Sequence, residues 1–157
     1  MITGYILFGC ILLPTLTALA WIDARTFRLP NLLTLPLIFI GFLFAYYNSS
    51  FSLIASILGA IVGYAGFVSL EYVFRRIYSK DGLGRGDAKL LAAGGAWCGG
   101  LGLPYIILIA SLCGLVFTQM PSQKQRAKTG NFNIPFGPFL SLGIAVIWLG
   151  QIYITSH

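Results

Sequence analysis

Long apolar runs fill most of this chain, and short segments rich in polar residues, glycine or proline separate them. A helix that crosses a bilayer needs about 20 predominantly apolar residues, because the hydrocarbon core is about 30 Å thick. Six stretches of this kind occur: Ile2–Ile22, Asn31–Tyr47, Phe51–Phe74, Ala88–Leu103, Pro104–Met120 and Phe139–Thr155. Only a glycine-rich turn around Gly100 and Pro104 separates the fourth from the fifth. The pattern predicts an all-α integral membrane protein, a polytopic bundle of about six transmembrane helices.

The composition supports a membrane protein without a soluble module. The chain has 157 residues, of which 57% are hydrophobic and 9% charged, and its mean hydropathy is +0.85. Soluble domains carry about 25% charged residues, so this chain cannot build a water-soluble surface. The six stretches use nearly its whole length. We therefore expect residues 1–157 to form a single membrane-embedded domain surrounded by the lipid bilayer.

The distribution of positive charge predicts the topology. Threading six helices alternately through a bilayer puts three loops on one side, Asp23–Pro30, Arg75–Asp87 and Pro121–Pro138. All ten Lys and Arg residues then lie in or directly beside these loops. The positive-inside rule makes that side cytoplasmic and puts the N-terminus and His157 outside. The net charge of +6 does not indicate a nucleic-acid partner, because that reading needs a basic face on a soluble fold.

Two spacings of small residues, Gly59 with Gly63 and Gly95 with Gly99, lie in the third and fourth stretches. Such spacings let helix backbones approach closely in lipid, where no hydrophobic effect drives helices together. They are common in membrane helices, so they predict packing between helices rather than a functional site.

Few residues can carry chemistry. The sole histidine, His157, lies opposite the charged loops, which excludes a serine–histidine triad. The three cysteines form no CxxC pair and the phosphate-binding loop pattern is absent, so neither a metal site nor a cofactor is expected. The acidic residues that remain are Asp23, Glu71, Asp81 and Asp87. An ionisable group at membrane depth is costly, which makes it a functional candidate.

Asp23 and Asp87 share the cytoplasmic side and a similar depth, at the end of the first stretch and the start of the fourth. If helix packing brings them together, two close carboxylates cannot both ionise easily, and one stays protonated. One can then act as a general base on water and the other as a general acid on a peptide carbonyl. The run Gly82–Asp87 contains Gly84 and Gly86, which leaves room for an extended substrate backbone.

Both aspartates also have structural interpretations. Asp23, at a helix boundary, can pair with Arg25 or Arg28. Asp87 can be the N-cap of the fourth helix, because aspartate is strongly preferred there. Capping and catalysis do not exclude each other.

The remaining acids favour structural roles. Glu71 precedes Arg75 by four residues, the favourable order for an ion pair on a helix. Asp81 lies in a polar loop, where water can solvate it. A relay through Asp23, Asp87 and Glu71, as in a small ion-coupled transporter, is the alternative to hydrolysis. Three of the four acids lie at one interface, which disfavours a relay. A non-catalytic assembly scaffold is a third hypothesis.

Three segments resemble a known family. Asp23–Asn31 reads Asp-Ala-Arg-Thr-Phe-Arg-Leu-Pro-Asn and Gly84–Leu90 reads Gly-Arg-Gly-Asp-Ala-Lys-Leu. Both are similar to signature segments of the type IV prepilin peptidases, the bacterial GxGD-type membrane aspartyl proteases. Ile134–Leu140 resembles the segment that precedes the last helix in that family. The three occur in the family's order over nearly the whole chain, which makes the resemblance specific.

The resemblance implies a multi-pass aspartic endopeptidase of the bacterial inner (cytoplasmic) membrane that serves type IV pili or type II secretion. Its implied substrate is a prepilin or pseudopilin, from which it removes the short basic leader after a glycine, directly before a hydrophobic helix. The catalytic pair carries over to Asp23 and Asp87. The other family positions, in the motif and the substrate loop, are Gly84, Gly86, Lys89 and Asp81.

Two features depart from the family's pattern. Asp81 stands where the family often has a glutamate, and we expect it to help position substrate or loop. Longer members carry an N-terminal segment with paired CxxC motifs, which is associated with methylation of the newly exposed N-terminus. This chain begins at its first span, so we expect a short form without that methyltransferase function.

Overall fold

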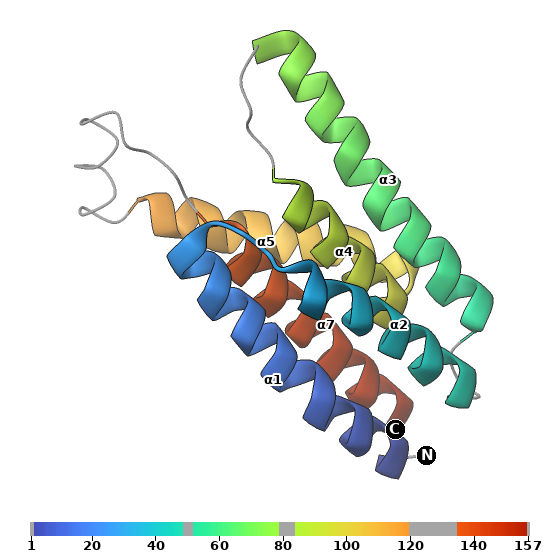
Figure 1. Ribbon diagram of the computed structural model, residues 1–157. Coiled ribbons are helices and arrows are strands. Elements are labelled where there is room, and N and C mark those ends of the chain that lie inside the picture. Colours follow the sequence, from blue (N-terminus) through green and yellow to red (C-terminus); the bar gives the residue numbers. More distant parts are fainter. Residues whose placement is uncertain (1, 49–51, 79–83, 120–134, 157) are drawn as a thin grey trace.

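The structure is a computed structural model that describes residues 2–48, 52–78, 84–119 and 135–156. Within these ranges the chain is helical and contains no strand. The helical elements are α1 (Ile2–Thr26), α2 (Asn31–Tyr47), α3 (Leu53–Tyr78), α4 (Arg85–Cys98), the 3-10 helix η1 (Gly100–Gly102), α5 (Leu103–Thr118) and α7 (Gly137–Ser156). The predicted all-α bundle of about six helices is confirmed (Figure 1).

Most of these helices suit a bilayer. Three segments are long and apolar enough to cross a membrane, Gly4–Thr26, Leu53–Ile77 and Gly100–Thr118. Two shorter apolar helices cover Asn31–Tyr47 and Gly137–Tyr153. Large apolar side chains stay exposed along these helices, a surface that lipid covers favourably and water does not. The chain is a multi-pass membrane protein.

Helix α4 differs from the others. It has 14 residues, which span about 21 Å, less than the bilayer core of about 30 Å. It packs against α2, α3 and α7 (Figure 1). Every residue from Leu90 to Cys98 is buried. The predicted span Ala88–Leu103 is therefore wrong at its end, since Gly99 adopts a φ of 73° and stops the helix after Cys98. Protein rather than lipid surrounds α4, so its length need not match the bilayer.

Small residues bring α3 and α4 together. A Cβ added to Gly59 would lie 2.5 Å from the carbonyl oxygen of Gly95, closer than real side chains come. The Ser56 hydroxyl donates a hydrogen bond of 2.6 Å to the carbonyl oxygen of Ala96 across the same interface. The packing predicted from the small-residue spacings is confirmed.

One end of the bundle collects the ends of helices from distant parts of the chain. Helices α1, α3 and α5 end there and α2, α4 and α7 begin there, while the two termini lie close together at the opposite end (Figure 1). Among the described residues, helices that alternate in direction and are even in number produce this arrangement. It puts the last turn of α1 and the first turn of α4 at the same end.

Candidate active site

Asp23 lies one turn before the end of α1 and is 5% exposed. Helix α1 packs against α7, whose first residue is Gly137. The backbone N–H of Gly137 donates a hydrogen bond of 2.9 Å to Oδ2 of Asp23. A donor at a helix N-terminus stabilises a carboxylate through the bond and through the helix dipole. The start of α7 therefore holds the Asp23 carboxyl in place.

The arginines that follow Asp23 do not pair with it. The guanidinium carbon of Arg25 lies 4.2 Å from the centre of the Trp21 ring, which is a cation–π contact on the outside of α1. Arg28 is exposed beyond the end of the helix. In the part of the chain that the structure describes, no ion pair joins Asp23 to Arg25 or Arg28. The interpretation of Asp23 as a boundary residue in such a pair is therefore wrong.

Asp87 is the third residue of α4, at the same end of the bundle. Helix α4 begins at Arg85, and Gly84 is its N-cap in an extended conformation (φ −80°, ψ 132°). The interpretation of Asp87 as the N-cap is therefore wrong. Asp87 lies instead in the first turn of α4, where the helix dipole favours negative charge. Asp87 is half-buried.

The two carboxyl groups lie close enough to influence each other. Asp87 precedes the buried core of α4 and lies outside the apolar spanning helices. Burial and, next, the negative charge of Asp23 raise the pKa of Asp87 from 3.8 to about 7, against the opposing effect of a backbone hydrogen bond with Gly84. Below about pH 7 Asp87 therefore holds a proton beside Asp23. The structure brings the two aspartates together, as the sequence predicted.

The two motif glycines make room for protein atoms. A Cβ on Gly86 would lie 2.9 Å from the Cβ of Leu29, in the connection between α1 and α2. A Cβ on Gly84 would lie 3.3 Å from Oδ2 of Asp87. The expected open approach for a substrate backbone is therefore wrong at Gly86, where Leu29 occupies the space. The glycine lets the chain that follows α1 close against the start of α4.

Two of the other candidates, Lys89 and Glu71, have partners outside the carboxyl pair. Lys89 Nζ donates a hydrogen bond of 2.6 Å to Oδ1 of Asn31 and so ties α4 to the start of α2. Arg75 Nη2 lies 3.4 Å from Oε1 of Glu71, which confirms the predicted ion pair. Asp81 lies outside the described residues. Lys89 thus connects two helices, and Glu71 forms an ion pair within α3.

Gly137 was missed as a functional candidate. The sequence indicated Ile134–Leu140 as a segment similar to a family region but gave none of its residues a role. The signal in the sequence is the dipeptide of Gly137 and Pro138, which indicates the start of a helix because proline is enriched in the first turn. The N–H groups of a first turn have no acceptor within their own helix. Such groups are free to bind a carboxylate that comes from another helix.

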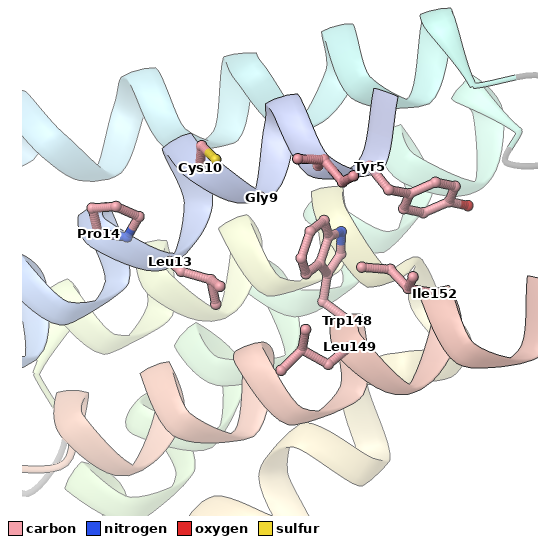
Figure 2. Close-up of a pocket in the computed structure, with 9 residues that line it drawn as sticks. Tyr5, Gly9, Cys10, Leu13, Pro14, Trp148, Leu149 and Ile152 are labelled. Carbon is pink, nitrogen blue, oxygen red and sulfur yellow. The ribbon is translucent and has the colours of Figure 1, made fainter. Parts of the chain in front are cut away.

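A separate cavity of about 380 Å³ opens between α1 and α7 (Figure 2). Tyr5 and Leu13 of α1 and Trp148 of α7 are among its mainly apolar lining, which includes no carboxylate. It lies towards the chain termini, away from Asp23. Among the described residues, no group of three or more His, Cys, Asp or Glu side chains could hold a metal ion. This cavity offers apolar contacts rather than reactive groups.

Comparison with known proteins gives consistent matches. A profile of the type IV leader peptidase family matches residues 10–119. A prepilin leader peptidase/N-methyltransferase of Stutzerimonas stutzeri is 38% identical over 148 residues, which cover 92% of this chain and 51% of that protein. Proteins of the same name from Xanthomonas campestris and Escherichia coli (strain K12) are each 40% identical, over 96% and 100% of this chain and 53% and 67% of their own lengths. The chain thus spans about half the length of most of these relatives. No solved structure matches it.

Proposed function

Because this chain belongs to the type IV leader peptidase family, we propose that it is an aspartic endopeptidase that removes the basic leader of type IV prepilins or pseudopilins. One observation carries the proposal. Two carboxyl groups from distant parts of the chain, Asp23 on α1 and Asp87 on α4, interact at one end of the bundle. A half-neutralised carboxyl pair can hydrolyse a peptide bond with neither a metal ion nor a nucleophilic side chain.

The surroundings of each aspartate suggest its role. Asp23 accepts a hydrogen bond from the N-terminus of α7 and acts as the base. It takes a proton from a water molecule, whose oxygen attacks the peptide carbonyl carbon. Asp87, protonated below about pH 7, gives its proton to the carbonyl oxygen. The resulting diol collapses when Asp23 passes its proton to the leaving nitrogen and Asp87 regains one from a hydroxyl group.

The position of the pair suits a substrate with a basic leader. Asp23 and Asp87 lie at the bundle end that carries the arginines and lysines of the described chain. By the positive-inside rule this end faces the cytoplasm, and the membrane is the bacterial inner membrane. A leader kept in the cytoplasm by its own positive charge presents the following bond at the depth of the pair.

Conversion of each aspartate to asparagine tests the mechanism. Asp23→Asn removes the base and Asp87→Asn the acid, so each should slow leader removal from a co-expressed prepilin by at least about 100-fold. Immunoblots of prepilin and mature pilin measure cleavage, and quantification of the membrane fraction confirms that each variant accumulates.

Glu71→Gln is the matched control, because it makes the same change at an acid whose partner is Arg75. It should retain most of the cleavage activity. Normal processing by either aspartate variant would refute the carboxyl-pair mechanism. Absence of prepilin processing by the original protein would refute the peptidase proposal and favour the scaffold or the transporter.

A further inference from the structure

The backbone N–H groups in the first turn of α7 have different hydrogen-bond acceptors. The N–H groups of Phe139 and Leu140 both donate to the carbonyl oxygen of Phe136, at 3.1 Å each. The N–H of Gly137 instead donates a hydrogen bond of 2.9 Å to a residue outside α7, to Oδ2 of Asp23. The Gly137 N–H, which has no acceptor inside its own helix, thus binds a carboxyl group of another helix.

The space that a side chain at Gly137 would need is occupied by Asp23. A Cβ added there would lie 2.6 Å from Oδ2, 2.9 Å from Cγ and 3.1 Å from Cβ of Asp23. Real Cβ atoms essentially never approach other heavy atoms closer than 3.0 Å. Any larger residue must therefore displace the carboxyl group or the start of α7.

The start of α7 is anchored independently of Asp23. The ring of Phe136 stacks on Phe67 of α3, with centroids 6.3 Å apart and planes inclined by 24°. Further along α7, a Cβ on Gly143 would lie 2.8 Å from the carbonyl oxygen of Ile106 in α5. Because these contacts hold α7, the carboxyl group is the part expected to move when Gly137 gains a side chain.

We propose that Gly137 is a positioning residue for leader-peptide hydrolysis: its N–H orients the Asp23 carboxyl, and its missing side chain leaves the space that this carboxyl occupies. The proposal rests on the proposed function, in which Asp23 is the base. Misplacing a catalytic group by about 1 Å can cost about 100-fold in rate, so this contact contributes to turnover rather than to substrate binding.

The decisive variant is Gly137→Ala. It should lower kcat for leader cleavage by about 100-fold and leave KM nearly unchanged, because only the geometry of the base is altered. Gly150→Ala is the matched control on the same helix, since a Cβ there meets nothing within 4 Å, and it should cleave like the original protein.

Hydrogen exchange provides a test that does not need Gly137→Ala to fold. Asp23→Ala should accelerate exchange of the Gly137 amide, whereas the amides of Phe139 and Leu140, which donate to Phe136, should stay protected. Asp87→Ala should leave the Gly137 amide unchanged. Equal exchange of that amide with and without Asp23 would overturn the proposal.

Failure of this proposal is distinguishable from failure of the proposed function. If the original protein cleaves prepilin and depends on Asp23 and Asp87, but Gly137→Ala keeps its kcat, only the role of Gly137 is refuted. A loss that appears as raised KM, or that Gly150→Ala shares, also refutes it. If neither aspartate is needed for cleavage, the carboxyl-pair mechanism itself fails.

Discussion

Asp23 and Asp87 are chemically identical side chains that lie in different surroundings. Asp23 is buried but receives a hydrogen bond from the N-terminus of α7. Asp87 is half-buried, and burial together with the charge of Asp23 raises its pKa. The surroundings therefore favour a proton at Asp87, which fits the proposed assignment of Asp87 as the acid and Asp23 as the base.

This division predicts how cleavage depends on pH. The pKa of Asp87 is raised to about 7, so this group is protonated at lower pH and loses its proton as the pH rises through that value. If Asp87 is the acid, the rate should fall above about pH 7, roughly tenfold for each further unit. Initial rates of leader cleavage in proteoliposomes across this range measure the effect.

Glu71→Gln should show the same pH profile, because Glu71 pairs with Arg75 and the proposed mechanism gives it no role. A rate that stays constant well into the alkaline range would exclude Asp87 as the proton donor.

Much of the site could be predicted from the sequence because the chain has few reactive side chains. With four acids and one histidine, elimination and the positions of Asp23 and Asp87 at helix ends made these two residues candidates, and the family resemblance then assigned them the catalytic roles. The contact of Asp23 with Gly137 was not predictable in this way, because it joins residues 114 positions apart and uses a backbone N–H that every residue but proline carries. The N-cap assignment of Asp87 failed because acids are favoured both at the cap and in the first turn.

At the scale of elements, hydropathy predicted the helices but misplaced several of their ends, since the predicted stretches stop at Ile22 and Phe74 whereas α1 and α3 continue to Thr26 and Tyr78. The predicted bounds Asn31–Tyr47 agree with α2, which has an exposed apolar side. Helix α4 was predicted too long, because burial among α2, α3 and α7 permits alanine and glycine in place of a full apolar span. Its short length follows from this packing, and its N-terminus supplies Asp87.

The approach of α3 to α4 gives a prediction about stability. Gly95→Ala adds a Cβ in close conflict with the backbone carbonyl of Gly59, which cannot move without shifting α3. Overpacking of this kind costs about 1–3 kcal/mol, so the variant should melt at a lower temperature in detergent.

Gly66→Ala, also on α3, meets nothing within 4 Å and should change the free energy of unfolding by less than about 0.5 kcal/mol. Unchanged melting of Gly95→Ala relative to this control would show that α3 and α4 are packed less closely than the structure indicates.

At the scale of the whole molecule, the even number of alternating helices makes the two bundle ends chemically different. One end carries the carboxyl pair and the arginines of the described chain, and the other carries both termini (Figure 1). The positive-inside rule then predicts that the pair faces the cytoplasm. A peptidase for cytoplasmic leaders works only in this orientation.

Single cysteines test the orientation in a variant without Cys10, Cys98 and Cys113. Gln119, just after α5, is exposed near the end that carries the carboxyl pair, and Ser52, just before α3, is exposed near the opposite end. In intact cells a membrane-impermeant thiol reagent should label Ser52→Cys and should reach Gln119→Cys only after the membrane is opened. The reverse pattern would put Asp23 and Asp87 outside, where a leader held in the cytoplasm by its charge never arrives, and would remove the topological basis of the proposed function.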